Sequence, residues 1–227
     1  MKKLLIMILI CAPFLSVAQE QEYKERFEQL GSMLPTPNSY RTASGAPGED
    51  YWQQKADYSI KVKLDESSNK ITGSETITYY NQSPHPLNYL WLQLDQNMRA
   101  EGSDSELIST ATFFNDTIPA KYLEQYVANG GNSYDFPGGF NIESVKNADG
   151  KDMDYLVQKT MMKIRLPETL NPGENISFSV DWNYFVNDRM KGGGRSGYEY
   201  FEEDGNALYT IAQFFPRMAV YNDVEGW

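Results

Sequence analysis

One stretch decides the fold of this protein: Ile176-Ser177-Phe178-Ser179-Val180-Asp181-Trp182-Asn183-Tyr184-Phe185-Val186. Every second residue of this stretch is apolar, six in all, and a period of two is typical of a β-strand with one buried face. The stretch is also rich in β-branched and aromatic residues, which favour strands. We therefore interpret its aromatic side chains as part of a core, rather than as a surface platform for sugars.

Segments on both sides of this stretch show the same period. Residues 58–64 alternate between apolar and polar side chains, and so do residues 162–166. Strands are expected at 58–64, 71–80, 89–92, 162–166, 176–186 and 208–215, and turns at Asp65–Asn69, Asn147–Gly150 and Pro167–Gly173. The region 97–139 is irregular, so helix is expected only near the N-terminus. The sequence therefore predicts a mostly antiparallel β fold.

Residues 1–18 have the features of a secretory signal peptide. Lys2 and Lys3 precede an apolar stretch that is too short to span a bilayer comfortably. Small residues stand one and three positions before Gln19. We therefore expect cleavage after Ala18 and a mature protein that is secreted or periplasmic.

Residues 19–56 are predicted to form a short helix followed by an extended linker. Four apolar residues from Tyr23 to Leu34 are spaced 4, 3 and 4 positions apart, which places them on one helical face. Prolines and a glycine-rich run then end the helix. The β domain is expected to take up residues 57–227. No later apolar run reaches membrane-spanning length, so we expect no membrane span after signal cleavage.

The composition is that of a folded globular protein, and it excludes several classes of function. The 227 residues are 41% apolar and 14% aromatic, which suits one or two domains with a substantial core. The formal net charge of −11 argues against a nucleic-acid partner. Zinc sites and Ser-His-Asp centres draw on His and Cys residues, and this sequence has only His85 and Cys11, which lies in the predicted signal peptide. We expect no complete hydrolytic site in this chain.

Three polar motifs have simpler explanations than a binding site. His85 stands between two prolines in a strand connection, so we predict a solvated turn residue. Gly192–Arg195 lacks the Lys-Ser/Thr pair of a phosphate-binding loop and is interpreted as a flexible loop. The acidic and amide side chains between Asn147 and Asp154 miss the spacing of a calcium-binding EF-hand, and we interpret them as a polar hairpin.

The stretch Tyr209–Trp227 is harder to explain by structure alone. It begins as an apolar strand and then becomes dense in aromatic residues around Gln213 and Pro216. A glutamine at a strand end can direct its amide into a cleft, where it donates and accepts hydrogen bonds. The alternative, a glutamine that faces water at an edge, is equally open at this point.

This stretch resembles the end of the N-terminal domain of the gluzincin zinc aminopeptidases, the membrane alanyl aminopeptidase family, in its secreted bacterial branch. The resemblance runs from Leu34 to Trp227. Besides 209–227, the segments that carry it are Leu34–Gly48, Ile71–Glu75, Leu170–Glu174, the strand around Trp182 and Gly194–Tyr198.

The resemblance implies a β-saddle or sandwich-like domain, with a short N-terminal helix, that leans over a thermolysin-like catalytic domain. In such enzymes His-Glu-x-x-His and a distant Glu hold the zinc, and the Glu between the histidines activates the metal-bound water. Neither His-Glu-x-x-His nor Gly-x-Met-Glu-Asn occurs here, so no catalytic residue and no metal ligand is expected in this chain. Zinc is expected in a C-terminal catalytic domain, which would be the domain's partner in a longer enzyme. We expect these residues to be inactive by themselves.

The resemblance also implies a role for Gln213, which would bind the free amine at the N-terminus of a peptide substrate. Phe214 and Phe215 would line the adjoining pocket. Ala212 stands where the family has Thr, and Phe215 stands where it has a second Gln or a Glu. Two rivals stay open: a stand-alone β module that binds glycan or peptide through surface aromatics, and an inactive relative that acts as a scaffold.

Overall fold

The computed structural model describes residues 37–108, 117, 119–128, 136–192 and 195–227. The predicted signal peptide and N-terminal helix lie outside these residues, as do Gly193 and Gly194 of the glycine-rich loop. Among the described residues, no helix is long and apolar enough to cross a membrane.

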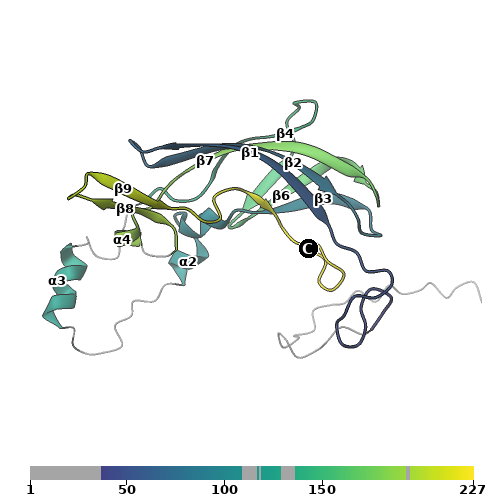
Figure 1. Cartoon of the computed structure of the whole chain (residues 1–227), viewed down its shortest axis with the longest axis horizontal. Helices are drawn as coiled ribbons and strands as arrows, with labels where there is room; N and C mark the ends of the chain where they lie inside the picture. Colours follow the sequence, from purple (N-terminus) through teal and green to yellow (C-terminus); the bar gives the residue numbers. More distant parts are fainter. Residues whose placement is uncertain (1–36, 109–116, 118, 129–135, 193–194) are drawn as a thin grey trace, which may run out of the picture.

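Two curved antiparallel sheets form the body of the molecule, and a small hairpin lies to one side (Figure 1). The first sheet has the order β1-β2-β7-β4, with bounds Lys55–Asp65, Lys70–Tyr80, Asn175–Phe185 and Asn141–Asn147. The second has the order β10-β3-β6-β5, with bounds Arg217–Met218, Leu87–Gln93, Met161–Leu170 and Tyr155–Gln158. The hairpin consists of β8 (Gly197–Phe201) and β9 (Asn206–Thr210). The prediction of a mostly β, sandwich-like fold is confirmed.

The predicted strand 176–186 is β7, and its alternation is confirmed as one buried face. Phe178, Val180, Trp182 and Tyr184 are buried between the sheets. They meet apolar side chains from β3 and β6 of the second sheet, namely Leu90, Leu92, Met162 and Ile164. Burial of each large side chain contributes roughly 1.5–3 kcal/mol, so this face supplies much of the stability of the fold.

Gly73 of β2 makes room for the largest side chain of this core. It pairs with Trp182 across the β2–β7 ladder, and a Cβ atom at Gly73 would lie 2.2 Å from the Trp182 ring. The ring also stacks on Tyr184 at 6.0 Å and meets the edge of Phe140 at 5.5 Å. The glycine is therefore required by packing and not by a turn.

The predicted turn Pro167–Gly173 begins too early in the sequence. Strand β6 continues through Pro167 to Leu170, and the turn follows it, with Gly173 in the left-handed region at φ +83°. Pairing between β3 and β6 is irregular where Pro167 lies, and β5 pairs with β6 only as far as Ile164. Proline lacks a backbone N–H, so it is tolerated where the ladder has no hydrogen bond to lose.

The expectation that helix occurs only near the N-terminus is wrong. The short helical segments are η2 (Asp95–Arg99), α2 (Asp104–Leu107), α3 (Ala120–Ala128) and α4 (Arg189–Gly192). Segment η2 is fixed by distant contacts, because the Asn97 side chain donates to the carbonyl of Lys159 at 2.7 Å and accepts from the N–H of Phe140 at 2.7 Å. Such contacts leave no periodic signal in a sequence.

The other predicted turns are confirmed. Residues 66–69 close the β1–β2 hairpin, with Asn69 at φ 50°. In the turn at 147–150, Gly150 donates its N–H to the carbonyl of Asn147 at 2.9 Å. This second turn leads from β4 in one sheet to β5 in the other, so it links the two layers of the sandwich.

Candidate functional site at the Gln213 turn

Gln213 lies in a sharp bend between β9 and β10. The predicted strand 208–215 is wrong in its second half, because β9 ends at Thr210 and Gln213 adopts a left-handed backbone with φ 52°. Only two other non-glycine residues in the described part of the chain, Asn69 and Lys159, have positive φ, and both stand in β-hairpin turns. A left-handed glutamine outside a hairpin turn is uncommon and points to a constraint from its surroundings.

The constraint comes from Gln96 of η2. Its buried side chain donates through Nε2 to the carbonyl oxygens of Ala212 at 3.0 Å and of Gln213 at 3.1 Å. The Gln96 Oε1 atom in turn accepts a hydrogen bond from Arg99 at 3.1 Å. On the other side, the Ala212 N–H donates to Ser196 Oγ at 3.3 Å. The backbone of the bend is therefore fixed from two neighbouring segments.

The side chain of Gln213 is left free by this arrangement. Gln213 is exposed, and its amide has no hydrogen-bond partner among the described residues. The two following rings are half-buried and pack against the core, with Phe214 and Phe215 edge to face at 5.1 Å. Phe215 also meets Tyr58 at 5.5 Å. The three predicted site residues thus lie together, with one free amide beside two partly exposed rings.

Arg217 and Asp223, the other polar residues of this stretch, are engaged in ion pairs. Arg217 Nε lies 2.8 Å from Asp95, and this hydrogen bond raises the pKa of the guanidinium. Asp223 accepts from Arg41 at 2.7 and 2.9 Å, which lowers the pKa of its carboxyl group. Both pairs fix the path of the chain after Gln213, so neither side chain is available to a ligand as a free charge.

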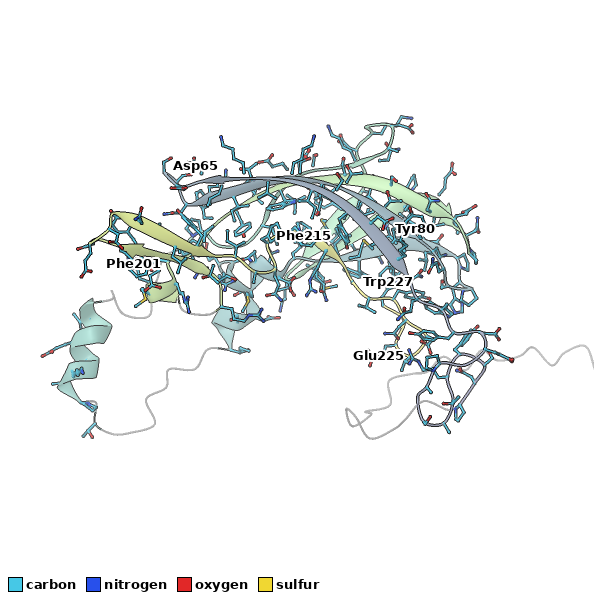
Figure 2. The ribbon with its side chains drawn as sticks, viewed as in Figure 1. Asp65, Tyr80, Phe201, Phe215, Glu225 and Trp227 are labelled. Atoms are coloured by element: carbon cyan, nitrogen blue, oxygen red, sulfur yellow. The ribbon has the colours of Figure 1, made fainter. Side chains whose placement is uncertain are left out.

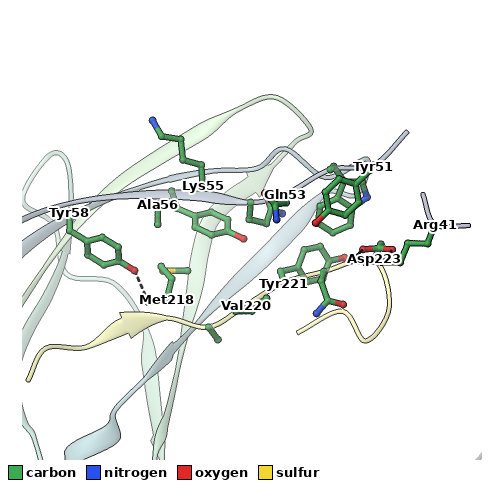
Figure 3. Close-up of a pocket in the computed structure, with 15 residues that line it drawn as sticks. Arg41, Tyr51, Gln53, Lys55, Ala56, Tyr58, Met218, Val220, Tyr221 and Asp223 are labelled. Carbon is green, nitrogen blue, oxygen red and sulfur yellow. Dashed lines mark hydrogen bonds and ion pairs between the residues drawn. The ribbon is translucent and has the colours of Figure 1, made fainter. Parts of the chain in front are cut away.

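A pocket of about 510 Å³ opens beside this segment, and the sequence analysis did not predict it (Figure 3). Its walls come from the segment Tyr51–Tyr58, from Tyr79 and from the segment Met218–Asp223. Gln213, Phe214 and Phe215 do not line it. The aromatic residues of 51–58 were a signal for it, but they fall where we expected a linker and the first strand.

A second feature that sequence reasoning missed is the buried carboxyl group of Glu75. It lies on the inner face of β2 and is 1% exposed, and neither carboxyl oxygen has a hydrogen-bond partner in the described structure. Burial raises the pKa of Glu75 to about 8. A signal for it was present in the sequence, since Glu75 follows Ile71 and Gly73 at steps of two, on the face that the structure buries.

The three polar motifs of the sequence contribute no site. His85 is exposed in the connection between β2 and β3, as predicted. The side chain of Asn147 accepts hydrogen bonds from the N–H groups of Asp149 and Lys151, which makes it part of the polar hairpin that we expected. Among the described residues, no group of three or more His, Cys, Asp or Glu side chains is placed to hold a metal ion.

No family model and no curated protein matches this chain. Among solved structures, this chain is similar to an M1 zinc metallopeptidase mutant from Deinococcus radiodurans, with 12% identity and a TM-score of 0.37 over 68% of this chain and 25% of that one. The same mutant bound to a Tyr-Ser-Ala substrate gives 12% identity and a TM-score of 0.36 over 68% and 26% of the two chains. This chain therefore spans about a quarter of the length of these structures.

Proposed function

We propose that this chain is the N-terminal, substrate-cleft-capping domain of a zinc metallo-aminopeptidase-like protein that removes N-terminal residues from peptides. In this proposal Gln213 binds the free amine of the substrate, and Phe214 and Phe215 contact the side chain of its first residue. The observation that carries it is the left-handed bend at Gln213, with its anchored backbone and free amide. The amine-binding role of Gln213 is taken from the sequence resemblance, which runs from Leu34 to Trp227.

The strained bend supports a binding role for Gln213, because strained residues cluster at functional sites. A non-glycine residue in the left-handed region costs about 1–3 kcal/mol, and it persists only where its surroundings impose it. Here the buried Gln96 imposes it, which fixes the backbone from which the free Gln213 side chain extends. The Oε1 atom of a glutamine can accept a charge-assisted hydrogen bond from an ammonium group. The formal net charge of −11 also favours the approach of a cationic amine.

The proposal assigns the zinc to a partner domain, which would pack against exposed apolar side chains of this chain. These side chains lie on the β8–β9 hairpin and on the segment after it, and Phe201 marks the outer end of the hairpin in Figure 2. They are Tyr200, Phe201, Leu208, Ile211, Val220 and Val224. The proposal requires the partner domain to cover these side chains. The proposal includes export to the periplasm or the medium, on the strength of residues 1–18.

The test is a titration of the isotope-labelled protein, followed by NMR, with the peptide Leu-Gly-Gly and with its N-acetylated form. We expect the free peptide to shift the side-chain amide signal of Gln213, and we expect the acetylated peptide to leave it unchanged. Gln213→Gly should abolish the response of neighbouring signals without loss of stability, because glycine adopts the left-handed backbone freely. Gln158→Ala, at an exposed position of β5, is the matched control. Equal responses to both peptides would show that the amine is not what Gln213 binds.

A stand-alone module that binds glycan is the second candidate function. It is favoured by one specific observation, the aromatic-lined pocket between Tyr51 and Asp223. The two functions concern different residues, so they can be tested separately in the same protein.

A further inference from the structure

The pocket beside the C-terminal segment has aromatic walls. Figure 3 shows the rings of Tyr51, Tyr58 and Tyr221 around it, and Tyr79 and Trp52 also line it. Its volume of about 510 Å³ falls within the range of roughly 300–1,000 Å³ that small-molecule sites occupy. The rings of Tyr51, Tyr58 and Tyr221 are partly exposed, so a ligand can reach them, whereas Trp52 and Tyr79 are buried.

Two buried polar groups in these walls have no partner in the described structure. They are the indole Nε1–H of Trp52 and the hydroxyl of Tyr79, on residues that are 9% and 1% exposed. Tyr79 lines the pocket together with Tyr221 and Tyr58. Buried donors without partners are rare in folded proteins, because each costs about 1–3 kcal/mol of lost hydration. Both groups are thus donors without a partner on side chains that line the pocket.

The charged residues of the pocket neutralise one another. Arg41 and Asp223 form a bidentate ion pair at one end of the pocket, where Figure 3 shows them side by side. Lys55 is paired with Asp57 at 2.8 Å. The other polar side chains in the walls are amides and hydroxyls, including Gln54 and Asn222. The pocket therefore presents no unpaired charge to attract an ionic ligand.

The pocket is also held open by contacts that do not use its donors. The hydroxyl of Tyr58 accepts the N–H of Met218 at 2.9 Å, which fixes one end. Trp52 and Tyr221 pack at 5.5 Å, and Tyr79 stacks on Trp227 at 6.1 Å. The rings are thus fixed in position while the Trp52 N–H and the Tyr79 O–H stay unused, which is the property of a preformed site.

We propose that this pocket binds a neutral saccharide. A pyranose ring combines apolar C–H faces, which pack on aromatic rings, with hydroxyl oxygens that accept hydrogen bonds from Trp52 and Tyr79. The neutral lining disfavours charged sugars and peptide termini. This site is separate from Gln213 and does not depend on the amine-binding proposal.

The experiment is isothermal titration calorimetry of the full chain with glucose, galactose and N-acetylglucosamine. We expect at least one of the three to bind with a Kd of about 1 mM or tighter. Tyr79→Phe removes only an unpartnered hydroxyl, and it should weaken binding roughly two- to tenfold while the melting temperature stays the same or rises. Trp52→Phe, which keeps an aromatic ring, should weaken binding to a similar degree. Tyr155→Phe, on the exposed strand β5, is the matched control and should bind as the unaltered protein does.

Three outcomes would overturn the proposal. The first is no binding of any of the three sugars at concentrations up to about 50 mM. The second is sugar binding that neither Tyr79→Phe nor Trp52→Phe changes, which would place the sugar elsewhere. The third is that a neutral proline- and tyrosine-rich peptide binds in a way that depends on Tyr79 while the sugars do not bind, since this would make the pocket a peptide site.

Discussion

The β2–β7 pair and the segment from Ile211 to Asp223 are held in place by different kinds of contact. In β2 and β7, eleven-residue strands pair along their whole length, and the inner side chains pack into the core. The later segment has only the two-residue strand β10, and it is fixed at points by Gln96, Asp95, Tyr58 and Arg41. Continuous pairing buries side chains, whereas attachment at points leaves side chains such as Gln213 free. The second region is therefore the one that can bind a ligand.

The strongest test of this contrast is Trp182→Ala in β7. Loss of a buried tryptophan should lower the free energy of unfolding by about 3–5 kcal/mol, because the cavity beside Gly73 cannot collapse fully. Phe185→Ala is the control, since Phe185 ends the same strand but is 36% exposed, and it should cost less than about 1 kcal/mol. Denaturant unfolding measures both. Similar losses at the two positions would contradict a core centred on Trp182.

A second prediction concerns Glu75, the polar exception on the inner face of β2. Its pKa is about 8 in the folded protein, against an ordinary value of 4.5, because burial disfavours the charged form. The contribution of Glu75 to the free energy of unfolding is therefore most favourable below about pH 4.5. It is lost as pH rises from about 4.5 to about 8, by roughly 1.4 kcal/mol per pH unit. Glu75→Gln should remove most of this slope and make the protein more stable near pH 8.

Thermal unfolding at several pH values, with both proteins in the same buffers, gives the two slopes directly. Glu168→Gln, at an exposed position of β6, serves as the control for loss of one negative charge. Parallel curves for Glu75→Gln and the unaltered protein would mean that Glu75 is charged in the folded state.

The smallest expected effect on stability comes from Gln96→Ala. This variant removes one of the contacts that hold the segment from Ile211 to Asp223 in place. It leaves the carbonyl groups of Ala212 and Gln213 without their donor, at a cost of about 1–3 kcal/mol. The NMR response of the Gln213 region to Leu-Gly-Gly should fall much more than the stability does, because the bend loses its anchor. Gln158→Ala again serves as the matched control. An undiminished peptide response in Gln96→Ala would show that the anchor is not needed for binding.

The sequence predicted the paired region well because its signal is local. The alternation around Trp182 is a property of neighbouring residues, and it predicted strand β7 and its buried face. The β propensity of residues 71–80 predicted strand β2 in the same way. The predicted end of the strand near Pro167 was wrong. A proline is tolerated inside β6 because the pairing of β6 with β3 is irregular there, and the sequence does not show that irregularity.

The segment from Ile211 to Asp223 could be predicted only in part. Resemblance singled out Gln213, Phe214 and Phe215, and the structure shows that they lie together, but their binding role stays a prediction. The bend itself depends on Gln96, which is more than a hundred positions earlier in the chain. The pocket likewise joins residues near Tyr51 to residues near Tyr221. Contacts over such separations leave no period in the sequence, so only the structure shows them.

The close approach of Gly73 to Trp182 has a consequence for how this protein can change during evolution. The side chains at positions 73 and 182 occupy the same space in the core, so a larger residue at one position requires a smaller residue at the other. A methyl group at position 73 becomes acceptable only after the indole has been replaced by a smaller ring, and the smaller ring alone leaves a void. The two exchanges are each harmful alone and compatible together, so this glycine and this tryptophan should be inherited or replaced as a pair.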